Sequence, residues 1–209
     1  MKKNYLIALL AFVCQFASAQ LEPVAYRGAF APAPAAMWTD SWTNWNPQNE
    51  PYTDAATIVT VSANITTNTT WTTGKTYKLN GTIYVTNNAT LTIQPGVVVK
   101  GIYSNTGTAL VITKGAKINA VGTAASPIVF TSDKVAGTRA PGDWGGIILL
   151  GKGKFNQTGG LNNIEGLAAN ANTEYGGGTT PDVNDNSGIM KYCRIEYGGF
   201  EFSPNNEIN

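Results

Sequence analysis

The stretch Leu91-Thr92-Ile93-Gln94-Pro95-Gly96-Val97-Val98-Val99 decides the fold of this chain, because its apolar pattern returns further along the sequence. Nineteen positions on, the same pattern places apolar residues or glycine at Leu110, Ile112, Gly115 and Ile118. A weaker echo, Ile148, Leu150 and Gly153, follows after twice that interval. A repeat of about 20 residues is typical of a solenoid, in which each coil buries its apolar face against the next. We therefore predict stacked coils with Leu91 over Leu110 and Ile93 over Ile112.

The sequence on either side of this repeat favours short β-strands. From Thr57 onward threonine alternates with Ile, Val, Leu and Tyr, residues whose branched or aromatic side chains suit a pleated strand. Asn87-Asn88 and Gln94-Pro95-Gly96 are turn signals between these strands. The alternative is an antiparallel meander, for which Asn80-Gly81 would be one hairpin turn. A meander does not require the same pattern to return in register, so we expect an all-β solenoid.

The N-terminus reads as a secretory signal peptide over residues 1–19. A basic start is followed by the apolar run Leu6–Cys14 and by the small residues Ala17-Ser18-Ala19, which predict cleavage after Ala19 and a secreted protein. The apolar run is too short to span a bilayer, which takes about 20 residues. The alternative, a lipid on Cys14, fits less well because Val13 stands where that cleavage needs a small residue. We divide the rest into an arm with a tryptophan-rich cap (20–55) and β-helix coils (56–209).

Composition excludes several classes of partner and chemistry. The chain has 14 basic and 13 acidic residues, and removal of Lys2 and Lys3 leaves it close to neutral, so nucleic acid is not an expected partner. It has no histidine, which excludes His-ligated zinc and the commonest general base. Cleavage at Ala19 would leave Cys193 as the one cysteine, so no internal disulfide is expected. No transmembrane segment is expected in the mature chain.

Two insertions interrupt the coils. Ser132–Asp143 is a short polar loop, and residues 156–187 form a long loop rich in Gly, Asn and Thr. A loop of that length inside a compact domain is usually functional or disordered. We also expect the coils to continue past Asn209, because solenoids need a polar terminal cover and none is evident here.

Several motifs resemble a known family. They are Ser126–Ser132, Ala140–Ile147, Tyr26–Phe30, Asn46-Pro47-Gln48 and Ile189–Gly199. They look like secreted right-handed parallel β-helix proteins of the pectin-lyase-like fold, which are exported to bacterial surfaces, often by the type IX route. The resemblance implies a right-handed parallel β-helix and says little of function, because most members are uncharacterised. Such proteins usually end in a β-sandwich sorting domain, which no part of this sequence matches.

A first candidate site is a calcium site at Asp182, Asn184 and Asp185. Closely spaced oxygen ligands suit Ca²⁺, which takes six to eight of them. The stretch Asp182–Asn186 does not match an EF-hand loop, which needs glycine at its sixth position and a closing glutamate. The alternative is a set of ordinary turns, in which Asp and Asn are common. Calcium is the one cofactor the sequence predicts, and none is required.

A second candidate is the tryptophan set Trp38, Trp42 and Trp45. Exposed indole rings can stack on sugars, which would make these residues a ligand-binding site for a polysaccharide or a cell-envelope component. They precede the first coil, so the alternative is a cap over the open end of the core, where burial of large rings removes much surface from water.

A third set of residues bears on whether the protein is a binding protein or an enzyme. Arg194 and Glu196 should face outward on a coil strand, with Lys191 and Glu201 nearby. The resemblance implies that a polysaccharide lyase would use Arg or Lys as its base beside Ca²⁺-binding carboxylates. An ion pair explains these residues more simply, because no larger cluster of carboxylates accompanies them. We therefore expect a non-enzymatic surface protein for adhesion, glycan binding or a structural role. The alternative is a calcium-dependent polysaccharide lyase or a related carbohydrate-active enzyme.

Overall fold

The computed structural model describes Phe30, Pro32, residues 34–203 and residues 206–207. The predicted signal peptide, the cleavage site at Ala19 and Cys14 lie outside the described residues. The chain divides into two units, one up to Asp40 and one from Ser41 to Asn209, and every named strand lies in the second. No helix in the described part of the chain is long and apolar enough to cross a membrane.

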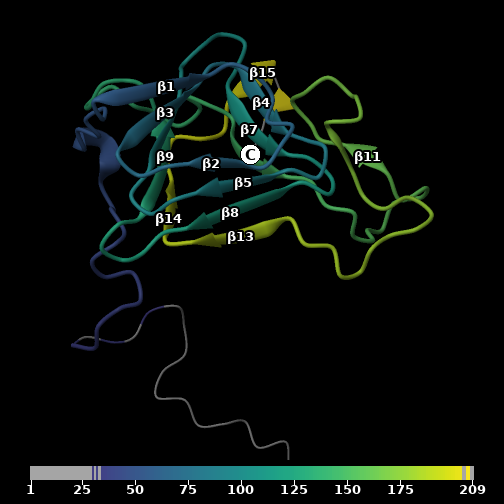
Figure 1. The fold of residues 1–209 in the computed structure, drawn as a ribbon, viewed down its shortest axis with the longest axis horizontal. Helices are drawn as coiled ribbons and strands as arrows, with labels where there is room; N and C mark the ends of the chain where they lie inside the picture. The colour runs from purple at the N-terminus through teal and green to yellow at the C-terminus, as the bar shows by residue number, and fades with distance from the viewer. Residues whose placement is uncertain (1–29, 31, 33, 204–205, 208–209) are drawn as a thin grey trace, which may run out of the picture. The chain divides into compact units, whose positions relative to one another are not determined.

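Three parallel sheets form the body of the second unit (Figure 1). Sheet A contains β1 (Thr57–Val61), β3 (Lys75–Leu79), β6 (Val98–Gly101), β9 (Ile128–Ser132) and β14 (Cys193–Ile195). Sheet B contains β4 (Thr82–Val85), β7 (Ala109–Ile112) and β10 (Gly146–Leu149). Sheet C contains β2 (Thr69–Trp71), β5 (Thr90–Ile93), β8 (Lys117–Val121) and β13 (Gly188–Lys191).

The chain visits these sheets in the fixed order A, B, C and then A again. Strands β3, β4 and β5 make one coil, and β6, β7 and β8 make the next, each pairing in parallel with the strand one coil away. In the first coil an isolated parallel bridge from Ile65 to Val85 takes the place of a sheet-B strand. This is a parallel β-helix, as the sequence predicts, and the antiparallel meander is wrong. Asn80-Gly81 turns the chain from sheet A to sheet B rather than closing a hairpin.

The predicted stacking of individual residues is wrong. Leu91 lies beside Ile118 and Ile93 beside Ala120, 27 positions on, while Leu110 pairs with Ile83. The third copy of the pattern, which begins at Ile148, is also out of register with the strand pairing, because Ile147 and not Ile148 pairs with Leu110.

The repeat at 19 positions belongs to the corners and not to whole coils. Both copies are a strand, a turn closed by a glycine with positive φ, and another strand. One copy turns at Gly96 (φ 77°) from sheet C to sheet A, and the other at Gly115 (φ 83°) from sheet B to sheet C. Glycine adopts this conformation without steric cost, so the same local pattern serves at different corners of the coil.

Alternate residues of each strand point into the coil and form the core. Tyr77, Val99 and Phe130 stack across sheet A and are buried, as is Leu110 in sheet B. Trp71 stacks on Tyr77 in the early coils, with ring centroids 4.8 Å apart. Burial of each large aliphatic side chain stabilises the fold by about 1.5–3 kcal/mol, so these ladders are the main favourable contribution.

The two long connections extend outside the coils. The predicted loop 156–187 carries a small antiparallel pair, β11 (Asn162–Asn163) and β12 (Glu174–Tyr175), and lies to one side of the sheets in Figure 1. After β14 the chain forms a second antiparallel pair, β15 (Glu201–Ser203) and β16 (Asn206–Glu207). A short 3-10 helix, η1 (Pro47–Asn49), precedes β1.

Candidate functional sites

The outer face of sheet A is covered by residues 47–55, which we call the strap. At its middle, the Tyr52 hydroxyl donates a hydrogen bond of 2.7 Å to Glu196 Oε1 and accepts one of 3.1 Å from Arg194. Arg139 donates to the Glu50 carbonyl at 2.6 Å. Burial and the hydrogen bond to Glu196 raise the pKa of Tyr52 above its ordinary value, so it stays a neutral donor.

Ion pairs fix the other end of the strap. The Lys100 ammonium contacts the Tyr52 carbonyl at 2.7 Å and the Asp54 carboxylate at 2.6 Å. Lys78 joins Asp54 at 2.8 Å and Asp133 at 2.9 Å. Burial acts to raise the pKa of Asp54, but the hydrogen bonds from Lys100 and Lys78 outweigh it and lower that pKa. The charges of sheet A therefore hold the strap in place.

Arg194 and Glu196 point outward from sheet A, as the sequence predicts, but they lie beneath the strap. Glu196 is buried, and the side chain of Arg194 is only 18% exposed. An arginine that acts as a catalytic base must reach a substrate, and this guanidinium instead contacts Tyr52 and Glu196. The arrangement is a partly buried ion pair that fastens the strap to the last coil.

The predicted calcium residues form turns at the end of the long loop. Asp182 Oδ1 accepts the N–H of Asn184 at 2.9 Å, and Asp185 Oδ2 accepts the N–H of Lys152 at 2.6 Å. The first bond is the ordinary turn chemistry of Asp, and the second joins residues 33 positions apart and anchors the loop just after β10. No three His, Cys, Asp or Glu side chains gather to hold a metal in the described residues. Calcium at Asp182, Asn184 and Asp185 stays a prediction.

The three tryptophans belong to two different units of the chain. Trp38 belongs to the first unit, where it stacks on Phe30 with ring centroids 6.2 Å apart. Trp42 meets Tyr192 edge to face at 5.4 Å, and Tyr192 links β13 to β14 in the last coils. Trp42 therefore lies at a corner of the last coils, and both the cap and the ligand-binding role of the three tryptophans stay predictions.

An aromatic corner forms where sheet C turns into sheet A, and we define it as Trp42, Lys191 and Tyr192. The Lys191 ammonium lies 5.4 Å from the centre of the Tyr192 ring. Trp45, three residues beyond Trp42, is 75% exposed. The sequence identified the tryptophans, but nothing in it indicated that Tyr192 would be their neighbour, since 150 residues separate Trp42 from Tyr192.

The aromatic corner borders the outer face of sheet C, which differs from the other two faces in its exposure. On sheet A the outward residues Thr76, Lys100 and Thr131 are buried, and on sheet B Ala109 and Val111 are buried. The outward residues of the sheet-C strands are all exposed or half-exposed; they are Thr70, Thr90, Thr92, Lys117, Asn119, Val121, Ile189 and Lys191. Their side chains offer hydroxyl, amide and ammonium groups and no carboxylate.

The outer face of sheet B is covered by the long loop. Ala109, Val111 and Leu150 form a small buried cluster with half-buried side chains from the loop and from the segment after β14, namely Ile164, Leu167, Tyr175 and Phe202. Lys114 pairs with Glu174 and fixes β12 beside this face. The long loop, which the sequence left as either functional or disordered, is therefore packed on the solenoid.

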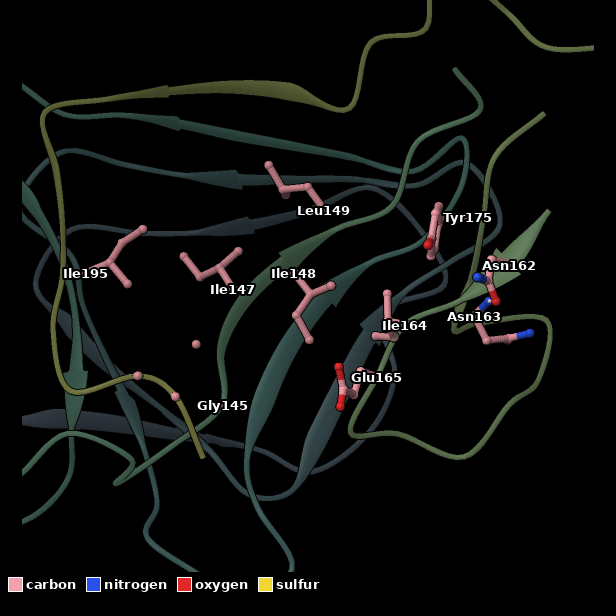
Figure 2. A pocket seen from close by; sticks show the side chains of 13 residues that line it. Gly145, Ile147, Ile148, Leu149, Asn162, Asn163, Ile164, Glu165, Tyr175 and Ile195 are labelled. Carbon is pink, nitrogen blue, oxygen red and sulfur yellow. Dashed lines mark hydrogen bonds between the residues drawn. The ribbon is translucent and has the colours of Figure 1, made fainter. Parts of the chain in front are cut away.

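A hollow of about 990 Å³ lies along β10 (Figure 2). One part of its wall is apolar and comes from the last coils, with Ile147, Leu149 and Ile195. The other part comes from the long loop, with Asn162, Glu165 and Tyr175. No pattern in the sequence indicates this hollow, because its wall combines β10, Ile195 of β14 and residues of the long loop.

The stacked parallel sheets and their covered faces define a parallel β-helix protein. A family model described as a pectate-lyase like beta helix domain matches residues 63–209, more than half of the chain, and the chain belongs to this family. Neither the comparison with curated proteins nor that with solved structures gave a match.

Proposed function

We propose that this protein is a secreted, non-enzymatic surface protein that binds an extended glycan along the outer face of sheet C and the aromatic corner. One observation carries the proposal. Of the three faces of the β-helix, sheet C alone has outward strand residues that are all at least partly exposed, and its edge meets the pair Trp42 and Tyr192.

The chemistry of this surface suits a carbohydrate. Threonine, asparagine and lysine side chains on a flat sheet supply hydrogen-bond donors and acceptors at regular intervals of about 4.8 Å between strands. Tyr192 and Trp42 at its border are aromatic rings with a polar edge, a combination that can stack on a sugar and still reach water. The absence of carboxylates on the outward strand residues of sheet C, beside Lys117 and Lys191, favours a neutral or anionic chain.

Secretion is part of the proposal. It is supported by the sequence of residues 1–19 and by the single remaining cysteine, Cys193. Export by the type IX route rests on the family resemblance alone. N-terminal sequencing of the protein from culture medium or cell surface should begin at Gln20, and a protein that keeps Met1 would contradict it.

The binding test uses residues 20–209 on an array of immobilised glycans. The variants Trp42→Ala and Tyr192→Ala should each weaken binding about tenfold, since loss of one stacked ring removes about 1.4 kcal/mol. Tyr103→Ala is a matched control, because Tyr103 is exposed and carries Lys134 over its ring at 3.9 Å, away from sheet C. Folded protein with no affinity for any glycan, or equal losses in all three variants, would exclude this role.

The alternative, a calcium-dependent polysaccharide lyase, draws no support from Arg194, which the strap covers. A lyase would need a catalytic base other than Arg194. Incubation with uronic polysaccharides and calcium would decide it, because lyase products absorb ultraviolet light.

A further inference from the structure

Trp42 of the aromatic corner and the strap belong to one continuous segment of chain, and a short hydrogen-bonded connector joins them. The Asn44 side chain in the connector donates to Glu50 Oε2 in the strap at 3.1 Å. Asn44 Oδ1 also accepts the N–H of Asn46 at 2.9 Å, and η1 begins at the next residue. Because these bonds order the connector, a movement of the strap is passed on to Trp42.

The strap itself is anchored at both ends on the sheet-A side of the solenoid. At its start, the N–H of Gly137 donates to the Gln48 carbonyl at 2.8 Å, and Gln48 Nε2 donates back to the Gly137 carbonyl at 3.1 Å. At its end, the N–H of Ala55 donates to the Thr76 hydroxyl at 2.8 Å. Between these ends, Tyr52 reaches the last coil. These anchors lie on sheet A and on the short polar loop, and not on sheet C.

The docked strap can open without unfolding the coils. Tyr52 is its one buried residue, and the other contacts described above are hydrogen bonds and ion pairs whose groups water can satisfy when the strap lifts. Tyr52 also has a φ of 35°, in the left-handed region that residues other than glycine rarely adopt, so docking carries a backbone cost. Segments with few buried apolar contacts open at free energies below that of global unfolding. The strap therefore has a docked and a lifted state.

We propose, on the basis of the glycan-binding function proposed above, that the docked strap positions Trp42 against Tyr192 and so couples sheet A to glycan binding on sheet C. With the strap docked, the two rings meet at 5.4 Å and both are in place for a sugar. With the strap lifted, Trp42 loses this anchorage and the aromatic corner keeps Tyr192 without it. Coupling between two sites is reciprocal, so docking strengthens glycan binding and a bound glycan stabilises the docked strap by the same factor.

The first test measures the position of Trp42 without any glycan. The strap variant carries Tyr52→Ala and Asp54→Ala, which remove the buried ring and the ion pairs with sheet A. In protein labelled with 5-fluorotryptophan, the fluorine signal that is lost in Trp42→Phe identifies Trp42. In the strap variant this signal should move toward its position in urea. The signal of Trp71, which is buried in the early coils, should stay where it is and so report an intact fold.

The second test measures the coupling to glycan binding. The strap variant should bind a glycan retained by the array about tenfold more weakly than the parent, the same loss as in Trp42→Ala. Combination of the strap substitutions with Trp42→Ala should cause no further loss, because both remove the same contact, whereas an unrelated structural defect would add its own loss. A saturating glycan should slow amide hydrogen exchange in the strap of the parent about tenfold.

Two further variants separate the connector from a general loss of surface contacts. Glu50→Ala removes the bond to Asn44 and leaves the anchors on sheet A, so it should move the Trp42 signal in the same direction as the strap variant. Glu174→Ala is the matched control, because Glu174 pairs with Lys114 and fixes the long loop on sheet B. It should leave the Trp42 signal and the glycan affinity at their parent values.

Three results would overturn the proposal. A Trp42 signal that stays in place in the strap variant would show that Trp42 holds its position without the strap. Parent affinity for the glycan in the strap variant would show that the two faces are not coupled. A further loss on combination with Trp42→Ala would show that the strap acts by another route. A parent protein that binds no glycan would contradict the function proposed above, and the fluorine signal would still decide whether the strap positions Trp42.

Discussion

The hydroxyl of Tyr52 donates a 2.7 Å hydrogen bond to the carboxylate of Glu196, 144 positions later in the chain. Tyr52 lies in the strap before the first strand, and Glu196 follows β14. The neighbouring carbonyl of Tyr52 accepts a bond from Lys100 of β6. The strap thus connects the last coil to an earlier one directly, although in most solenoids each repeat contacts only its neighbours.

Replacement of Tyr52 by phenylalanine should destabilise the protein by about 2 kcal/mol. The ring would still pack, but Oε1 of the buried Glu196 would lose its 2.7 Å hydrogen bond and keep only the 3.6 Å contact with Arg194, which compensates the desolvation of the carboxylate poorly. Urea denaturation followed by circular dichroism measures the change. Tyr103→Phe, at an exposed tyrosine, should have no effect, and equal stability of the two variants would mean that the strap does not hold Glu196.

Asp54→Asn should make the stability of the protein less sensitive to acid. The pKa of Asp54 is lower in the folded state than in the unfolded chain, so its contribution is complete above about pH 4 and is lost as the pH falls through the folded value. The variant should be less stable at pH 7 and should lose less stability below pH 4. Measurement of the free energy of unfolding against pH checks this. Glu165→Gln, at an exposed carboxylate, should show the same pH dependence as the parent protein. The parent's pH dependence in Asp54→Asn would contradict the pairing of Asp54 with Lys78 and Lys100.

Local sequence patterns predicted the fold but not the register in which strands of successive coils pair. Alternating apolar residues and glycine turns indicate stacked strands wherever they occur, so the parallel β-helix follows from stretches such as 91–99. The partner of Leu91 depends on the length of a whole coil, which includes loops of any size at its three corners. Paired residues of β5 and β8 are 27 positions apart in the sequence. Paired residues of β8 and β13 are 70 positions apart, because the long loop lies between these two strands.

The candidate sites were less predictable for the same reason. The sequence identified Trp42 and Trp45 by type and Arg194 by its alternation with apolar residues. Whether Arg194 is open to a substrate depends on the strap, whose Tyr52 meets Arg194 across 142 positions of sequence. The hollow along β10 has no local signal in the sequence, because its wall combines residues of β10, of β14 and of the long loop.

The thiol of Cys193 should react slowly with iodoacetamide. Burial raises the pKa of Cys193 to about 11, against a smaller opposing effect of a backbone hydrogen bond at Lys191, and the Sγ atom also contacts the Ala120 carbonyl at 3.3 Å. Since the thiolate is the reactive form, a pKa two units above normal lowers the rate about a hundredfold at pH 8. The rate should rise tenfold per unit between pH 7 and 9 without a plateau. In urea the thiol should recover ordinary reactivity, and a plateau near pH 9 in the folded protein would show an ordinary pKa.

Gly101→Ala should destabilise the protein, because a side chain at this position has no room. A Cβ atom on Gly101 would lie 2.7 Å from the Cβ of Trp144, which is fully buried and whose indole nitrogen donates to the Glu196 carbonyl at 2.8 Å. Trp144 would have to shift away from that bond, and overpacking of this kind costs about 1–3 kcal/mol. Gly153→Ala is the matched control, because no atom lies within 4 Å of a Cβ there and its φ is not positive. Urea unfolding of both variants should show a loss at Gly101 alone, and a stable Gly101→Ala variant would mean that Trp144 does not lie against β6.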